Sequence, residues 1–214
     1  NLVGIGLARH LYTGAIDTSF QGTGKRVKDA ALTAVVDACV DPNGRIVVAG
    51  MTPGANGSAG NKDLALVRFN ADGSDDLTFA GDGGIAFSRG DDAVDHDEAI
   101  RDVDCLANGN LLIAGWYDDG DARFGFVAEM PADGTPQSLR SYNFGASNGG
   151  TAAFISAAEI DSGIVATAFL TGTSAHGKVF FLSPGPSNYV ATASRSPFDV
   201  GGGITIPKCL SFAE

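Results

Sequence analysis

Residues 91–98 hold the densest group of side chains that could bind an ion. Their sequence, DDAVDHDE, places five carboxylates and one imidazole within eight residues. Ca²⁺ takes about six to eight oxygen ligands, many of them from carboxylates. We therefore expect a Ca²⁺ site, with the candidate ligands Asp91, Asp92, Asp95, Asp97 and Glu98. Because the segment lacks the spacing and the glycine of an EF-hand loop, a solvated acidic loop is the alternative.

A second candidate site is the aromatic pair Trp116-Tyr117, which is followed directly by Asp118 and Asp119. Aromatic rings beside carboxylates at the end of a strand could bind a carbohydrate, because each ring offers an apolar face with polar groups next to it. The alternative is that both rings simply pack in the core. Trp116 and Tyr117 are thus the candidate ligand-binding residues.

The sequence shows no pattern that indicates catalysis. Its histidines, His10, His96 and His176, are far apart, and no Gly-x-Ser-x-Gly motif is present. No His/Cys pair has the spacing of a zinc site, and no glycine-rich segment has the strand-and-helix context of a nucleotide-binding loop. We assign no catalytic residue, and no cofactor other than Ca²⁺.

Charge and composition exclude two classes of function. The chain has 214 residues, of which 14 are Lys or Arg and 25 are Asp or Glu, so its net charge is −11. Nucleic-acid binding requires a basic face that neutralises phosphates, and this chain does not supply one. No apolar segment approaches the roughly 20 residues of a spanning helix. We therefore expect neither nucleic-acid binding nor membrane insertion.

A short motif ending in phenylalanine and followed by glycines recurs along the chain and organises it. The phenylalanines are spaced by 59, 65 and 54 residues. The four copies are Asp17-Thr18-Ser19-Phe20, Asp76-Leu77-Thr78-Phe79, Ser141-Tyr142-Asn143-Phe144 and Arg195-Ser196-Pro197-Phe198. We expect each copy to form a corner between strands. Such a period, with several short strands in each unit, is typical of propeller blades.

Tight turns between apolar segments predict the strands of each unit. Asn43-Gly44 and Asn108-Gly109 each separate two apolar segments, which is a strong hairpin signal because both turn residues tolerate a positive φ. We expect an all-β fold: a β-propeller of about four repeats of 50–65 residues with antiparallel four-stranded blades. The single domain spans residues 1–214, with repeats at roughly 1–50, 51–115, 116–170 and 171–214.

The segments GRIVVAG, LALVRFNADGS and DLTFAGDG, all within residues 44–83, resemble the delta-60 repeat family. That family occurs in secreted and surface proteins of bacteria and is taken to form β-propeller blades. The resemblance is close over residues 1–87, fair to about 145 and degenerate beyond. It implies a fold and a location outside the cytoplasm, and it implies no common activity.

Cys39, Cys105 and Cys209 fall at about the same place in their repeats, and we expect them to be small buried core residues. A disulfide needs Cα atoms within about 7 Å, and equivalent positions of neighbouring blades usually lie farther apart except near the axis. For closure of the ring, two hypotheses stand. Either the strand at residues 1–6 completes the last blade and closes a four-bladed ring, or the chain is part of a larger propeller that a second chain, self-association or residues cut away would complete.

These patterns favour a non-enzymatic secreted β-propeller that acts as a binding or scaffold module, with a protein or carbohydrate partner. The alternatives are a propeller hydrolase or lyase with its site at the central channel, and a segment of a larger surface protein. The chain starts at Asn1 without a signal-peptide pattern, as a processed or trimmed chain would. Few lysines and an acidic balance suit a secreted or cell-envelope protein.

Overall fold

The computed structural model describes residues 3–54, 61–88, 97–118, 122–136, 140–145, 151–161, 163–170, 176–185 and 189–195. The regular elements within these ranges are β-strands. They are β1 (Val3–Ala8), β2 (Lys25–Leu32), β3 (Ala34–Val40), β4 (Ile46–Pro53), β5 (Lys62–Phe69), β6 (Gly84–Phe87), β7 (Glu98–Cys105), β8 (Leu111–Asp118), β9 (Arg123–Met130), β10 (Arg140–Gly145), β11 (Ala152–Ile160), β12 (Gly163–Leu170), β13 (His176–Pro184) and β14 (Tyr189–Arg195). In this part of the chain, no helix is long and apolar enough to cross a membrane.

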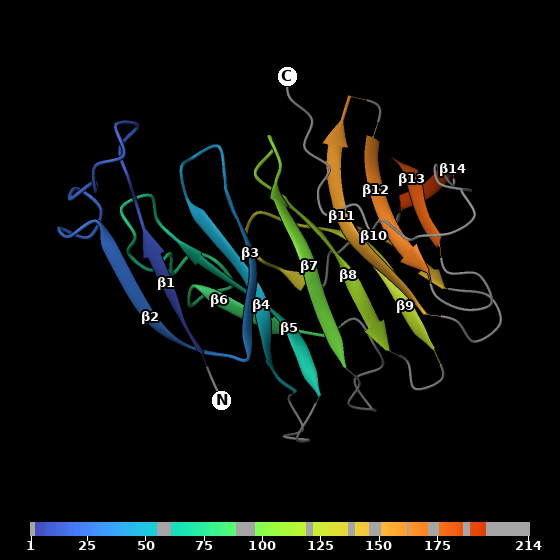
Figure 1. The fold of residues 1–214 in the computed structure, drawn as a ribbon, viewed down its shortest axis with the longest axis horizontal. Helices are drawn as coiled ribbons and strands as arrows, with labels where there is room; N and C mark the ends of the chain where they lie inside the picture. Colours follow the sequence, from blue (N-terminus) through green and yellow to red (C-terminus); the bar gives the residue numbers. More distant parts are fainter. Residues whose placement is uncertain are drawn as a thin grey trace.

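The strands form one two-stranded sheet and three four-stranded antiparallel sheets (Figure 1). We name them blade A (β1–β2), blade B (β3–β6), blade C (β7–β10) and blade D (β11–β14). In blades B, C and D each strand pairs with the next along the chain, as in propeller blades. The predicted all-β propeller fold is confirmed.

The blades are out of phase with the sequence repeats. The repeat at residues 1–50 contains β1 and β2 of blade A, followed by β3 and β4 of blade B. The two repeats that follow are split in the same way. Each repeat therefore supplies the two outer strands of one blade and the two inner strands of the next, so that the chain itself ties neighbouring blades together.

Local sequence explains both the hairpins and a bend that recurs in the first strands. Gly44 and Gly109 adopt φ values of 76° and 86° in the turns β3–β4 and β7–β8, as the Asn-Gly pairs predict. One extra residue interrupts the pairing of β3, β7 and β11 at the same place, between Val35 and Asp37 in β3. Such a bulge bends the strand and re-aims the side chain that follows it.

The core lies between the faces of successive blades. One cluster joins blades B and C through side chains such as Val47, Leu66, Ile113 and Phe126. A second joins C and D around Phe154 and Phe180, and a third joins A and B. Each blade is therefore stabilised mainly by its neighbours, as repeat architectures require.

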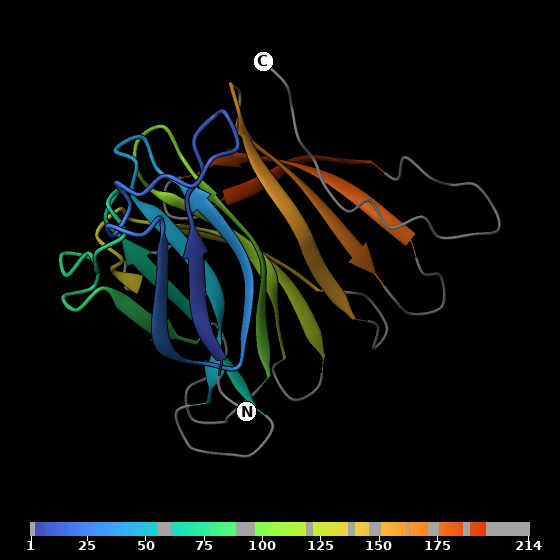
Figure 2. The same cartoon turned by 60° about the vertical axis from the view of Figure 1, so that its left-hand side comes forward.

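Two predictions about the repeats need correction or qualification. Phe144 is not a corner, because it lies in β10 and packs against Phe180 with ring centroids 4.7 Å apart. The fourth copy, ending in Phe198, lies outside the described residues. β1 pairs with β2 rather than with a strand of blade D, and blades A and D lie at opposite ends of the row in Figure 1, while Figure 2 shows blade A in front of blade B.

Candidate functional site

The residues that recur in the sequence meet at the contacts between blades. Arg68 is the last residue but one of β5. Its Nε donates to Oδ2 of Asp76 at 2.7 Å, and its guanidinium lies over the ring of Phe79 at 4.6 Å. Its Nη1 also donates to the carbonyl of Ala132 in blade C. We call this arrangement the corner lock: an arginine, an aspartate and a phenylalanine of one blade, bound to a turn of the next.

The same lock joins blade A to blade B. Arg9 Nε donates to Asp17 Oδ2 at 2.8 Å, and the Arg9 guanidinium lies 5.0 Å from the ring of Phe20. Arg9 Nη1 donates to the carbonyl of Ala71 at 2.6 Å, the counterpart of Ala132. In each lock the arginine stands eight residues before its aspartate, a spacing that recurs in the sequence and is the signal for the lock.

A glycine in the receiving turn makes room for the phenylalanine ring. A Cβ atom on Gly134, whose φ is +81°, would lie 2.7 Å from Cε2 of Phe79. On Gly73 it would lie 2.5 Å from Cζ of Phe20. The residue after each phenylalanine has a positive φ, and its N–H donates to a carbonyl of the receiving turn. In the B–C lock, Ala80 N donates to Asp133 O at 2.8 Å. Asp-Gly turns and Phe corners recur together because each blade's corner docks on the next blade's turn.

Burial distinguishes the two locks. Arg68 and Asp76 are only 2% and 3% exposed, whereas the Arg9 side chain is 37% exposed. Burial acts to raise the pKa of Asp76, but hydrogen bonds from Thr78 and the charge of Arg68 outweigh it, so the pKa lies below its usual value. The carboxylate is thus held ionised opposite its arginine.

A different contact joins blades C and D. Glu129 takes the place of Arg68 in the strand register, since their β-sheet partners, Leu112 and Val47, each follow the turn asparagine by four residues. Its Oε2 accepts a hydrogen bond from Tyr189 of blade D at 2.5 Å, and Oε1 accepts one from Asn110 at 2.7 Å. The arginine lock is therefore replaced where the sequence repeat degenerates.

The first strands of the blades are linked by a row of aspartates that sequence reasoning missed. Asp37 Oδ2 accepts a hydrogen bond from the backbone N–H of Val103 at 3.0 Å, from β3 to β7. Asp102 Oδ2 accepts one from Ala157 at 2.9 Å, from β7 to β11. Both aspartates follow a bulge and stand six residues before the asparagine of the next turn, which is the signal that could have found them.

These carboxyl groups lie close enough to affect one another. Burial raises the pKa of Asp102 to about 6; the Ala157 N–H works against this rise, and the charge of Asp37 adds to it. Burial also raises the pKa of Asp104, again aided by the Asp37 charge. A carboxyl pair whose proton is held near neutral pH is a common feature of acid–base sites, and also of structural networks.

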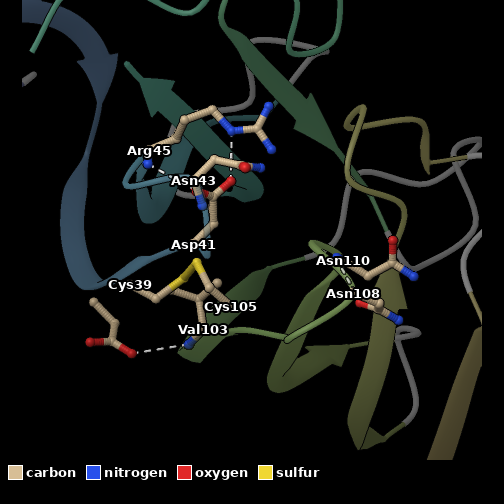
Figure 3. Close-up of a disulfide and its surroundings, with 9 residues drawn as sticks. Cys39, Asp41, Asn43, Arg45, Val103, Cys105, Asn108 and Asn110 are labelled. Carbon is tan, nitrogen blue, oxygen red and sulfur yellow. Dashed lines mark hydrogen bonds and ion pairs between the residues drawn. A yellow bond between two sulfur atoms is a disulfide. The ribbon is translucent and has the colours of Figure 1, made fainter. Parts of the chain in front are cut away.

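A disulfide joins Cys39 of β3 to Cys105 of β7, with Cα atoms 5.6 Å apart (Figure 3). The prediction of two separate core thiols is therefore wrong. The cysteines are not equivalent in the repeat register, because Cys39 stands four residues before Asn43 and Cys105 stands three before Asn108. β3 and β7, the first strands of their blades, lie next to each other, so a bridge can form between them. The close-up also shows that Asp41, in the turn between β3 and β4, accepts a hydrogen bond from Arg45 Nε at 2.6 Å.

The candidate Ca²⁺ ligands are only partly described. Asp91, Asp92 and Asp95 lie outside the described residues. Asp97 pairs with Lys62 Nζ at 3.4 Å, and the buried Glu98 accepts a hydrogen bond from Ser88 at 2.7 Å. Among the described residues, no three His, Cys, Asp or Glu side chains are placed to hold a metal ion. The Ca²⁺ site stays a prediction.

The rings of Trp116 and Tyr117 pack against neighbouring side chains. Trp116 is 6% exposed and is covered by Arg123, whose guanidinium lies 3.5 Å from the ring centroid. Tyr117 stacks on Phe124 with centroids 5.5 Å apart. Arg123 in turn forms a bidentate ion pair with Asp118. Carbohydrate binding at Trp116 and Tyr117 stays a prediction, for which Arg123 would have to move.

Two grooves lie at blade boundaries. One, of about 370 Å³, lies between β2 of blade A and β4–β6 of blade B. The other, of about 570 Å³, follows the B–C corner lock between Thr78 and Pro136. Neither groove is lined by Asp37 or Asp102. Both are therefore separate from the carboxyl pair.

Comparison with known proteins agrees with this arrangement. A family model described as "Domain of unknown function (DUF5122) beta-propeller" matches residues 42–79. These residues run from the first hairpin turn of blade B to the corner phenylalanine, and so include β4, β5 and the lock residues Arg68, Asp76 and Phe79. No curated protein sequence matches the chain significantly. With its three four-stranded antiparallel sheets and this match, the chain is a β-propeller repeat protein.

Proposed function

We propose that the chain is a non-enzymatic β-propeller that works outside the cytoplasm as a scaffold and binds a protein or carbohydrate partner on its surface. The observation that carries this proposal is the use of the recurring residues. Arg68, Asp76 and Phe79 fix one blade to the next, and Asp37 and Asp102 fix the inner strands. These contacts serve to hold surface loops on a rigid framework, which is how loop-based binding sites are commonly built.

The disulfide supports the location. Cys39–Cys105 bridges two blades within the core of the array. Structural disulfides persist in secreted and cell-envelope compartments and are rare in a reducing cytosol. The bridge thus suits a secreted or cell-envelope protein, in agreement with the resemblance to the delta-60 repeats.

One observation favours a second candidate, a hydrolase or lyase. The Asp37–Asp102 pair, with the Asp102 pKa raised to about 6, could donate and accept a proton near neutral pH. Against this role, each carboxylate already accepts a backbone hydrogen bond from the next blade.

A pair of assays distinguishes the two functions. The intact chain would be screened against arrays of extracellular polysaccharides and surface proteins, and every bound partner would then be incubated with it and checked for cleavage. The scaffold proposal expects a partner that is bound, is recovered unchanged, and is bound equally well by Asp102→Asn. Turnover that disappears in Asp102→Asn, while the thermal unfolding midpoint is kept, would replace the scaffold with the enzyme.

A further inference from the structure

The turn at residues 11–14 of blade A has the same build as the two turns that receive a corner phenylalanine. Gly14 N donates to Leu11 O at 2.8 Å, as Gly73 N donates to Asn70 O and Gly134 N to Pro131 O, both at 2.9 Å. The φ of Gly14, +84°, falls beside the values of 86° and 81° for Gly73 and Gly134. All three turns follow the same strand of their blade.

The turn of blade A differs in what lies against it. A Cβ atom on Gly73 or Gly134 would collide with a phenylalanine ring, but one on Gly14 would meet nothing within 4 Å. Leu11 is 49% exposed, and Tyr12, the counterpart of Ala71 and Ala132, is fully exposed. The receiving surface is formed in blade A, and among the described residues no ring fills it.

A second surface beside it is also uncovered. Val35 of β3 is 45% exposed, whereas Ile100 and Phe154, at the same register position in β7 and β11, are each 0% exposed. Those two residues are covered because blades B and C each place inner strands against the next blade. Blade A has only the two outer strands among the described residues, so the face of β3 with Val35 and Val40 stays open.

We infer that residues 11–14 and the open face of β3 together form a docking surface for one further repeat of this same type. A repeat supplies two outer strands with their corner and then two inner strands. A single repeat would therefore cover both the turn at residues 11–14 and the open face of β3. Its corner phenylalanine would lie on Gly14, its arginine would reach the carbonyl of Tyr12, and its inner strands would cover Val35 and Val40. The surface continues the A–B and B–C interfaces, and it is separate from the partner-binding role proposed above.

The register fixes the form of the test. Arg9 corresponds to Arg68 in the corner locks, and Arg68 corresponds to Glu129 in the strand register, so residue 1 corresponds to residue 121. A copy of residues 61–120 joined directly ahead of residue 1 therefore supplies the corner of Phe79 and the strands equivalent to β7 and β8 in the natural register. Hydrogen–deuterium exchange would be compared in the original and the extended chain, in peptides that cover residues 10–16 and 34–40.

Exchange in both segments is expected to slow by about tenfold or more in the extended chain. Gly14→Asn should abolish the slowing at residues 10–16, because asparagine tolerates a positive φ but adds a Cβ where the ring must lie. Gly22→Asn is the matched control: its φ is +71°, a Cβ there would also meet nothing within 4 Å, and it lies outside the turn. It should leave the slowing intact.

Phe79→Ala within the added copy should restore fast exchange at residues 10–16. Exchange at residues 10–16 and 34–40 that is the same in the original and extended chains would overturn the inference. So would equal slowing in the Gly14→Asn and Gly22→Asn chains, since the contact would then not run through the glycine turn.

Discussion

The ring of Phe79 lies directly on the backbone of Gly134 in the neighbouring blade, where a Cβ atom would come within 2.7 Å of the ring. Phe79 is fully buried, and the guanidinium of Arg68 lies 4.6 Å from the centroid of its ring. The blade boundary therefore depends on the absence of a side chain at one position and on a buried ion pair beside it.

Gly134→Ala should destabilise the protein by about 2–4 kcal/mol, because it combines an unfavourable φ with overpacking against Phe79. Gly81→Ala provides the control: its φ is +95° and a Cβ would meet nothing within 4 Å, so only the backbone cost of about 1–2 kcal/mol applies. Urea unfolding measures both. Equal losses for the two variants would show that the ring does not rest on Gly134.

Arg68→Met should cost about 3 kcal/mol, since it removes the 2.7 Å ion pair of the buried Asp76 and leaves the longer contact with Arg45 Nη1 at 3.8 Å. Arg9→Met removes the same contacts in blade A, where the Arg9 side chain is 37% exposed, and should cost about 1 kcal/mol or less. The difference is read from denaturant midpoints at neutral pH. A similar cost for both variants would contradict the role of burial.

Part of this arrangement could be predicted from the sequence. The Asn-Gly turns and the corners at Phe20 and Phe79 stand out because turn chemistry is local and glycine has few substitutes at a positive φ. The prediction of a third corner at Phe144 is wrong, because Phe144 fits the spacing but lies in β10, which follows a shorter connection than β6 does. Asp91, Asp92 and Asp95 remain untested as ligands.

Contacts between blades could not be read in the same way. Cys39 and Cys105 differ by one position in the repeat register, so alignment of the repeats does not reveal that their Cα atoms are 5.6 Å apart. Asp37 and Asp102 look like ordinary polar residues of half-exposed strands. Only the bulges and the approach of the inner strands direct them at the backbone of the next blade.

The raised pKa of Asp102 predicts how stability depends on pH. With a pKa of about 6 in the folded state and an ordinary value of 3.8, the folded protein binds a proton more tightly than the unfolded chain. The contribution of Asp102 to the free energy of unfolding should therefore fall as pH rises between about 4 and 6, by up to about 3 kcal/mol.

Asp102→Asn should remove that dependence, because its amide oxygen can still accept from Ala157. The variant should unfold at higher denaturant than the original above pH 6 and at about the same denaturant below pH 4. Other carboxylates, such as Asp76, contribute equally to the pH dependence of both proteins, so their contributions cancel when the two free energies of unfolding are subtracted. The exposed Asp161→Asn is the control. A difference that grows toward acid pH would reverse the predicted sign.

Removal of the disulfide should lower the free energy of unfolding by about 4 kcal/mol, because the bridge closes a loop of 66 residues in the unfolded chain. Cys39→Ala/Cys105→Ala would be compared with the original chain in urea, with and without reductant. Reductant should destabilise the original chain and leave the double variant unchanged. An original chain insensitive to reductant after full unfolding and refolding would argue against the bridge.

The pairing of the cysteines tests most directly whether β3 and β7 lie side by side in a propeller outside the cytoplasm. The protein would be isolated unreduced, with thiols blocked at lysis, and mapped by peptide mass spectrometry. The expected map contains a peptide that links Cys39 to Cys105. A link from Cys209 to either of the others, or three blocked thiols, would contradict the account.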